Sequence, residues 1–228
     1  MINLFINYYI SLNKERQDEI DYCFRKNLDN LLIDKIYVFV SKKINFPFGS
    51  GDGRIQLIDL ERPKYSDILH YFNSRDEFKE SYNVISNSDI YFDYSISFLD
   101  RIDMNNTCVV LNRWNIKKDE NPSHSDKIKS QDVWIFKGHT KKELEASSNF
   151  YMGKKACDCV FLNKLYKTGY RSVCPSYDIK AYHLHLSNYR TWKDGNDDIL
   201  GKRMYIRLCN IEDIEKGKDQ VNYYINKL

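Results

Sequence analysis

This sequence of 228 residues has little that would take it across a membrane. The segment from Met1 to Asn7 has no basic stretch and no long apolar core, so it does not resemble a signal peptide. No apolar run approaches the roughly 20 residues that a membrane-spanning helix needs. We therefore expect a cytoplasmic protein with no membrane span.

Cysteine is present, but its spacing does not predict a disulfide framework. The six cysteines include no CxxC pair and no regular spacing. Cys157 and Cys159 form a CxC pair, and His183 and His185 follow as His-x-His, so a zinc site is one alternative. This spacing matches none of the common zinc patterns. Reduced, mostly buried thiols explain the set better.

An excess of one charge is also missing. The 35 basic and 32 acidic residues give a net charge of +3, which argues against a general nucleic-acid-binding surface. A discrete anionic ligand suits this balance better. The length suits one large domain that buries enough surface to fold without disulfides.

Strand and helix patterns alternate along the first half of the chain. Short runs rich in β-branched and aromatic residues predict strands, and apolar residues that recur every three or four positions predict helices. We expect strands at 4–10, 35–40, 54–60, 82–86, 107–112, 132–136, 171–174, 179–186 and 204–208, helices at 13–28, 67–72 and 156–167, and a polar loop at 114–130. The alternation predicts an α/β fold with a mostly parallel sheet.

The segment Asn87-Ser88-Asp89 follows the expected strand at 82–86. Ligands bind at the carboxyl ends of strands in open α/β sheets, and amide and carboxylate oxygens suit a hard divalent cation that a diphosphate can share. The alternative is a plain turn, because Asn, Ser and Asp dominate turns.

A basic and aromatic group lies at the end of the third strand. Arg62 and Lys64 could neutralise a phosphate, while Tyr65 packs against a base or a sugar. The alternative is a helix N-terminus preceded by surface charges.

Asp158 lies at the start of the helix expected at 156–167. As a functional residue it would act as a general base toward an incoming hydroxyl group. The alternative is simple stabilisation of a carboxylate by the helix dipole.

Two histidines lie late in the chain. On a strand, His183 and His185 point to the same face, so either could complete a metal site that Asp89 begins. Arg190 could hold a phosphate oxygen. A structural role is the alternative for each histidine.

Together these clusters resemble the GT-A-type glycosyltransferases, and most of all the small domains known from chlorella viruses and bacterial polysaccharide loci. The segment 87–89 resembles the DxD motif of that family, with Asn87 at the first acid and Asp89 as the expected metal ligand. Phe92 matches the apolar residue that usually follows, and Cys157-Asp158 resembles the xED-like motif that supplies the base of inverting enzymes.

The resemblance covers residues 1–195 and implies a GT-A-like (Rossmann-like) mixed, mostly parallel sheet flanked by helices, with residues 196–228 as an extension packed on the same domain. It also implies that Tyr8 and Tyr9, at the end of the first strand, contact the nucleotide base. Gln131-Asp132 resembles a segment that lines the sugar or acceptor pocket, which makes Asp132 the second candidate for the base.

The resemblance therefore predicts a glycosyltransferase, hexosyltransferase-like, that uses Mn²⁺ or Mg²⁺ and a nucleotide sugar such as a UDP-linked one, with a glycan or other hydroxyl acceptor in polysaccharide synthesis. A nucleotidyltransferase is an alternative, although the segment after the first strand lacks the glycine-rich loop that holds a triphosphate. A non-catalytic nucleotide-sugar-binding module is another.

Overall fold

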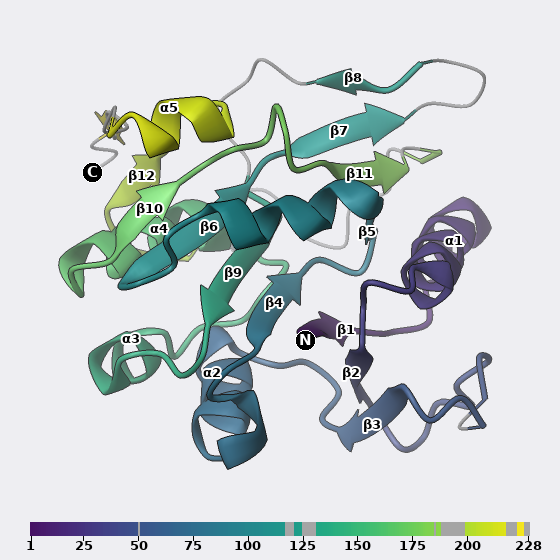
Figure 1. The fold of residues 1–228 in the computed structure, drawn as a ribbon. Coiled ribbons are helices and arrows are strands. Elements are labelled where there is room, and N and C mark those ends of the chain that lie inside the picture. The colour runs from purple at the N-terminus through teal and green to yellow at the C-terminus, as the bar shows by residue number, and fades with distance from the viewer. Residues whose placement is uncertain are drawn as a thin grey trace.

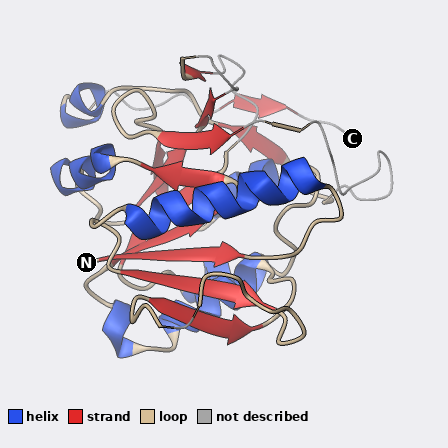
Figure 2. Cartoon of the chain, turned by 90° about the vertical axis from the view of Figure 1, so that its right-hand side faces the viewer, coloured by secondary structure: helices blue, strands red, loops and turns tan. Residues whose placement is uncertain are grey.

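The structure, a computed structural model, describes residues 1–49, 51–116, 121–124, 131–184, 186–187, 199–217 and 223–225. Its centre is a seven-stranded sheet of strands in the order β10-β6-β9-β4-β1-β2-β3, with helices on both faces (Figures 1 and 2). These strands are β1 (Ile2–Asn7), β2 (Lys35–Val40), β3 (Ile55–Asp59), β4 (Tyr82–Ser86), β6 (Thr107–Leu111), β9 (Val133–Lys137) and β10 (Arg171–Val173).

Helices and short 3₁₀ helices lie between these strands or follow them along the chain. They are α1 (Lys14–Asp29), α2 (Tyr65–Asn73), η1 (Asp76–Phe78), η2 (Tyr94–Arg101), α3 (Lys142–Ser147), α4 (Cys157–Lys167) and α5 (Ile211–Glu215). Helix α1 begins after Asn13, whose side chain accepts a hydrogen bond from the backbone N–H of Arg16. Helix α4 is followed by Gly169 at φ +75, a left-handed conformation that glycine adopts readily and that commonly ends a helix.

Most of the central sheet is parallel. β1 pairs in parallel with β2 and β4, β2 with β3, and β10 with β6, while β9 runs antiparallel between β4 and β6. The order β3-β2-β1-β4 is that of a Rossmann half, in which the chain moves outward from β1 in both directions. The predicted α/β class, with a Rossmann-like mixed and mostly parallel sheet flanked by helices, is confirmed.

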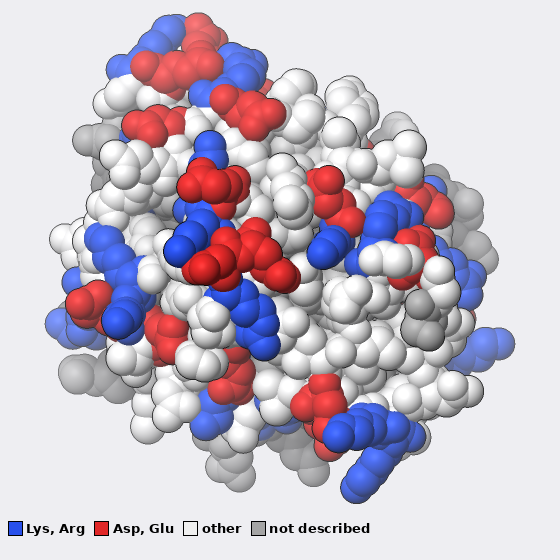
Figure 3. Space-filling view, turned by 60° about the horizontal axis from the view of Figure 1, so that its bottom comes forward, with Lys and Arg blue, Asp and Glu red and all other residues white. Residues whose placement is uncertain are grey.

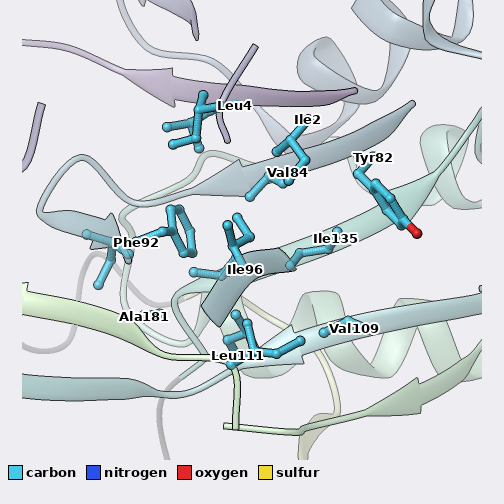
Figure 4. Close-up of a cluster of buried hydrophobic side chains, with 14 of the residues drawn as sticks. Ile2, Leu4, Tyr82, Val84, Phe92, Ile96, Val109, Leu111, Ile135 and Ala181 are labelled. Atoms are coloured by element: carbon cyan, nitrogen blue, oxygen red, sulfur yellow. The ribbon is translucent and has the colours of Figure 1, made fainter. Parts of the chain in front are cut away.

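The two faces of this sheet carry separate apolar cores, because successive side chains on a strand point to opposite sides. On one face, Leu4 and Ile6 of β1 pack with Ile20 and Phe24 of α1. Figure 4 shows the continuation of this core, in which Ile96 of η2 lies among side chains from several strands. The other core includes side chains of β1, β2, α2, α3 and α4.

A smaller sheet lies beyond the carboxyl edge of the central one. Its strands follow the order β5-β11-β7-β8, and they are β5 (Ile90–Phe92), β11 (Ala181–Leu184), β7 (Arg113–Ile116) and β8 (Ser123–His124). Two of them, β7 and β8, lie in the segment expected to be a loop. Short strands with mixed polarity form there because strand pairing, which is nonlocal, outweighs local preference.

The segment from residue 199 to 217 lies against the body of the domain. The backbone N–H of Ile199 bonds the carbonyl of Lys155, and that of Cys209 bonds the carbonyl of Cys174. A two-stranded sheet joins β12 (Arg203–Tyr205) to β13 (Tyr223–Ile225). The division of the chain at residue 195 stays a prediction.

Acidic and basic side chains are interspersed on the face that Figure 3 shows, which suits the small net charge. No helix in the described part of the chain combines the length and the apolar character that crossing a bilayer requires.

Candidate active site

The candidate site lies where β1 and β4 end side by side. β1 is the strand from which the sheet extends in both directions, so its carboxyl end is the topological switch point at which open α/β sheets bind ligands. The segment 87–89 leaves β4 at this point and turns directly into β5. Its polar side chains therefore lie at the edge where the sequence pattern predicts a ligand.

Strand pairing brings Asp89 and His183 together. In the antiparallel pair of β5 and β11, His183 lies opposite Ile90, the residue after Asp89. The Nε2 atom of His183 is 3.1 Å from Oδ2 of Asp89, and both residues are buried, at 1% and 6% exposed. The expected meeting of a mid-chain aspartate with a late histidine is present in this structure.

Two charged residues of α1 complete this group. Nη1 of Arg16 lies 2.7 Å from Oδ2 of Asp89 and 2.8 Å from Oε2 of Glu19. Burial by itself would raise the pKa of Asp89, but the charges and hydrogen bonds of His183 and Arg16 outweigh it and hold the pKa well below its ordinary value. Asp89 is therefore a carboxylate in this site.

The sequence interpretation missed Arg16 and Glu19, although a signal was present. Both belong to the helical stripe that contains Ile20, Cys23 and Phe24, because residues three and four apart share one face of a helix. A charged pair on an otherwise buried stripe indicates a partner inside the fold. Here that partner is Asp89, 73 residues further along the chain.

A second polar group lies on the other side of the same segment. The amide of Asn87 donates a hydrogen bond of 2.9 Å to Oδ1 of Asp132, and Nη1 of Arg113 lies 3.7 Å from that oxygen. Asp132 reaches this edge because it precedes β9, which runs antiparallel and so begins where β4 and β6 end. The other candidate base lies nearby, since the N–H of Gln131, the residue before Asp132, donates a hydrogen bond of 3.3 Å to Oδ2 of Asp158.

Asp158 lies in the first turn of α4, and the pKa of its carboxyl group is raised. Burial, together with the nearby charge of Asp132, raises its pKa from 3.8 to about 6, despite hydrogen bonds from the backbone N–H groups of Cys159 and Gln131. The residue that precedes the helix, Ala156, has φ +66, a left-handed conformation that is uncommon without glycine. A carboxyl group with a pKa near neutrality suits proton transfer.

Two of the residues expected to contact the nucleotide are inside the protein. Tyr8 is 1% exposed, its ring packs edge-on against Phe24, and its hydroxyl donates to Asp21. Tyr65 is fully buried and stacks on Phe161 at 4.2 Å. Neither ring presents a face to a ligand, because each belongs to an apolar core that local sequence does not reveal. This corrects the expectation for both.

The remaining candidates lie at or near the surface. Tyr9 is partly exposed, and its hydroxyl accepts a hydrogen bond of 3.3 Å from Nε of Arg16. Arg62 and Lys64 lie over the ring of Tyr151, at 5.7 and 5.4 Å. Ser88 is partly buried within the turn. His185 and Arg190 lie outside the described residues.

The described residues do not form a complete metal site in this structure. Within the ranges that the structure describes, no three His, Cys, Asp or Glu side chains are grouped so as to hold an ion. Cys157 accepts a hydrogen bond from the hydroxyl of Tyr65, and His183 lies with Asp89, so these two do not form the zinc site considered above. Asp89 and His183 supply two donors of the kind that Mn²⁺ accepts.

No family model and no curated protein matches this chain. Among solved structures, it is similar to a 2-C-methyl-D-erythritol 4-phosphate cytidylyltransferase from Francisella tularensis, with 12% identity, 96% of this chain and 99% of that chain covered, and a TM-score of 0.47. A mannosyltransferase from Pyrobaculum calidifontis, in complex with GDP-Man and Mn²⁺, has 14% identity, coverage of 85% and 58%, and a TM-score of 0.45. A mannose-6-phosphate isomerase from Helicobacter pylori has 10% identity, coverage of 85% and 99%, and a TM-score of 0.43. Similarities this distant assign no function.

Proposed function

We propose that this protein is a metal-dependent glycosyltransferase that moves a sugar from a nucleoside-diphosphate sugar, such as a UDP-linked one, to a hydroxyl group of a glycan or other acceptor. One observation carries the proposal. A single segment at the switch point of the sheet holds Asp89 against His183 on one side and, through Asn87, holds Asp132 near Asp158 on the other. The pair that would bind a cation and the candidate base are thus connected through this segment and Asp132.

Mn²⁺ or Mg²⁺ suits the first pair in the type of its donors. A carboxylate oxygen and an imidazole nitrogen are common ligands of Mn²⁺, and diphosphate oxygens complete the coordination of such ions. Asp89 and His183 would hold the ion. When bound, it would offset the negative charge that grows on the departing diphosphate.

The second group would handle the acceptor proton. With its pKa near 6, Asp158 is ionised at neutral pH and is still basic enough to accept a proton from a hydroxyl group. Asp132, held by Asn87, keeps that pKa raised by its charge. Arg62, Lys64 and Arg190 would contact phosphate oxygens, and Tyr9 would lie toward the nucleotide.

A donor screen tests the proposal. Purified protein is incubated with a panel of nucleotide sugars, with Mn²⁺ or with EDTA, and release of the nucleoside diphosphate is measured. We expect release that needs the metal and that falls at least 100-fold in Asp89→Ala, since removal of an electrostatic group at a reacting diphosphate costs roughly that much or more. Asp76→Ala is the matched control, because Asp76 is an exposed carboxylate paired with Lys79.

Three outcomes would contradict the proposal. Wild-type turnover by Asp89→Ala at saturating Mn²⁺ would show that Asp89 holds no essential ion. Release of pyrophosphate from nucleoside triphosphates, with no sugar transfer, would indicate a nucleotidyltransferase. Thermal stabilisation by UDP without any turnover would indicate a binding module.

A further inference from the structure

Arg16 occupies an unusual place for a positive charge. Its Nη1 atom lies between two carboxylates from different parts of the chain, 2.7 Å from Oδ2 of Asp89 and 2.8 Å from Oε2 of Glu19. The same oxygen of Asp89 lies 3.1 Å from Nε2 of His183. One guanidinium nitrogen thus contacts two carboxylates, and one of these carboxylates also contacts an imidazole; carboxylates and imidazole are donors that bind metal ions.

The surroundings fix these donors in place. The side chain of Glu19 is 1% exposed, and its other oxygen, Oε1, accepts hydrogen bonds of 2.6 and 2.7 Å from the backbone N–H groups of Leu186 and Ser187. This leaves Oε2 directed at Arg16. Two carboxylates that are buried this well require a nearby cation, since an unpaired buried charge is strongly unfavourable.

The spacing of the oxygens also explains why the described residues hold no ready metal site. Mg²⁺ bonds oxygen at about 2.0–2.1 Å, so each carboxylate oxygen would have to move inward by roughly 0.6–0.8 Å from its present distance to Nη1. A guanidinium is larger and keeps the two carboxylates apart. Its departure would let Asp89 and Glu19 close on a smaller ion, with His183 as the third donor.

We propose that Arg16 is a built-in cation at this site, and that Arg16 and a divalent metal ion bind there in mutual exclusion, with Glu19 joining Asp89 and His183 as a ligand once Arg16 has left. This inference extends the proposed function, and the role of the metal ion in it depends on that function. Arginine stays charged at all physiological pH values, so a change of pH does not release it. An anionic diphosphate, which a guanidinium binds in a bidentate manner, offers Arg16 an alternative partner.

Metal affinity measured without nucleotide tests this inference. Mn²⁺ is titrated into the protein, and the free ion is followed by its electron paramagnetic resonance signal. We expect Arg16→Gln to bind Mn²⁺ more tightly than the wild type by on the order of tenfold to 100-fold, because a competing charge less than 3 Å from both carboxylates has been removed. Adding Asp89→Asn to Arg16→Gln should abolish the gain.

Arg25→Gln is the matched control, because Arg25 lies on the same helix but over the ring of Phe48, and its Mn²⁺ affinity should equal that of the wild type. Arg16→Met serves if Arg16→Gln does not fold: methionine is unbranched and neutral, so it also removes the competing charge and should bind Mn²⁺ more tightly than the wild type.

Unchanged or weaker Mn²⁺ affinity in whichever folded Arg16 variant is measured would overturn mutual exclusion. The same holds if Asp89→Asn leaves the gain intact. Since no nucleotide sugar is present, absence of sugar transfer in the donor screen would refute the proposed function without altering this result.

Discussion

Replacing Asp158 by asparagine should make the protein less active and, at neutral pH, more stable. The carboxyl group of Asp158 has its pKa raised from 3.8 to about 6 by burial and by the charge of Asp132. Ionised Asp158 therefore destabilises the folded state. Asparagine has a similar shape and carries no charge, so it removes that cost.

The magnitude follows from the two pKa values. The difference between 3.8 and about 6, at about 1.4 kcal/mol for each pH unit, amounts to about 3 kcal/mol. Asparagine has one carbonyl oxygen in place of two carboxylate oxygens, so it loses part of the bonding to the N–H groups of Gln131 and Cys159, at about 1 kcal/mol. The net gain expected at pH 8 is about 2 kcal/mol.

The pH dependence has a definite sign. Because the folded pKa of Asp158 is raised, the stability that its protonated form contributes is fully present below pH 3.8 and is lost as the pH rises through about 6. The pH-dependent part of the gain is about 1 kcal/mol at pH 4.5 and about 3 kcal/mol at pH 8. Asp158→Asn should therefore match the wild type near pH 4.5 and exceed it at pH 8.

Urea denaturation at several pH values, followed by circular dichroism, measures this difference. Asp76→Asn is the control, because hydrogen bonding to Lys79 lowers the pKa of Asp76 and so predicts the opposite sign. In the donor screen, Asp158→Asn should lose about 100-fold to 10,000-fold in turnover, as is typical for removal of a general base. A stability difference that is the same at pH 4.5 and pH 8 would refute the assigned burial and coupling of Asp158.

Three further substitutions test the fold. Gly138→Ala should lower the free energy of unfolding by about 2–4 kcal/mol, because φ is +73 and the added Cβ would lie 2.5 Å from the backbone oxygen of Lys79. Gly153 has a similar φ of +70 but open space around it. Gly153→Ala should therefore lower the free energy of unfolding, measured by thermal or urea unfolding, by only about 1–2 kcal/mol. Asn27→Ala should cost about 2–4 kcal/mol, because the buried Asn27 amide bonds both the first carbonyl and the last N–H of β5, and hydrogen exchange of β5 amides should rise. Equal costs for the two glycines, or unchanged exchange in β5, would contradict these assignments.

The α/β class was predictable because it depends on local periodicity. The run 36–40 is apolar on both faces, which is typical of strands when helices cover a sheet on both sides. The helix at 13–28 was predictable within one residue at each end from its cap and its apolar stripe. Strand pairing was not, because no local signal says that β9 lies antiparallel between β4 and β6.

The sequence also indicated which polar residues belong to the candidate site, but not all of their partners. Asp89 and His183 were identified from type and position, and pairing of β5 with β11 brings them into contact. Tyr8 and Tyr65 were misplaced, because aromatic residues beside charged ones look the same in sequence whether they face solvent or a core.

By itself, then, the sequence determined the alternation of elements, the small net charge and the candidate acids and histidines, since all of these are local properties of composition and spacing. Only the tertiary structure decided that Arg16 and Glu19 join Asp89, and that Asp132 lies near enough to Asp158 to raise its pKa. The reason is physical: a charge acquires its environment from whatever the fold packs beside it, and those neighbours come from distant parts of the chain.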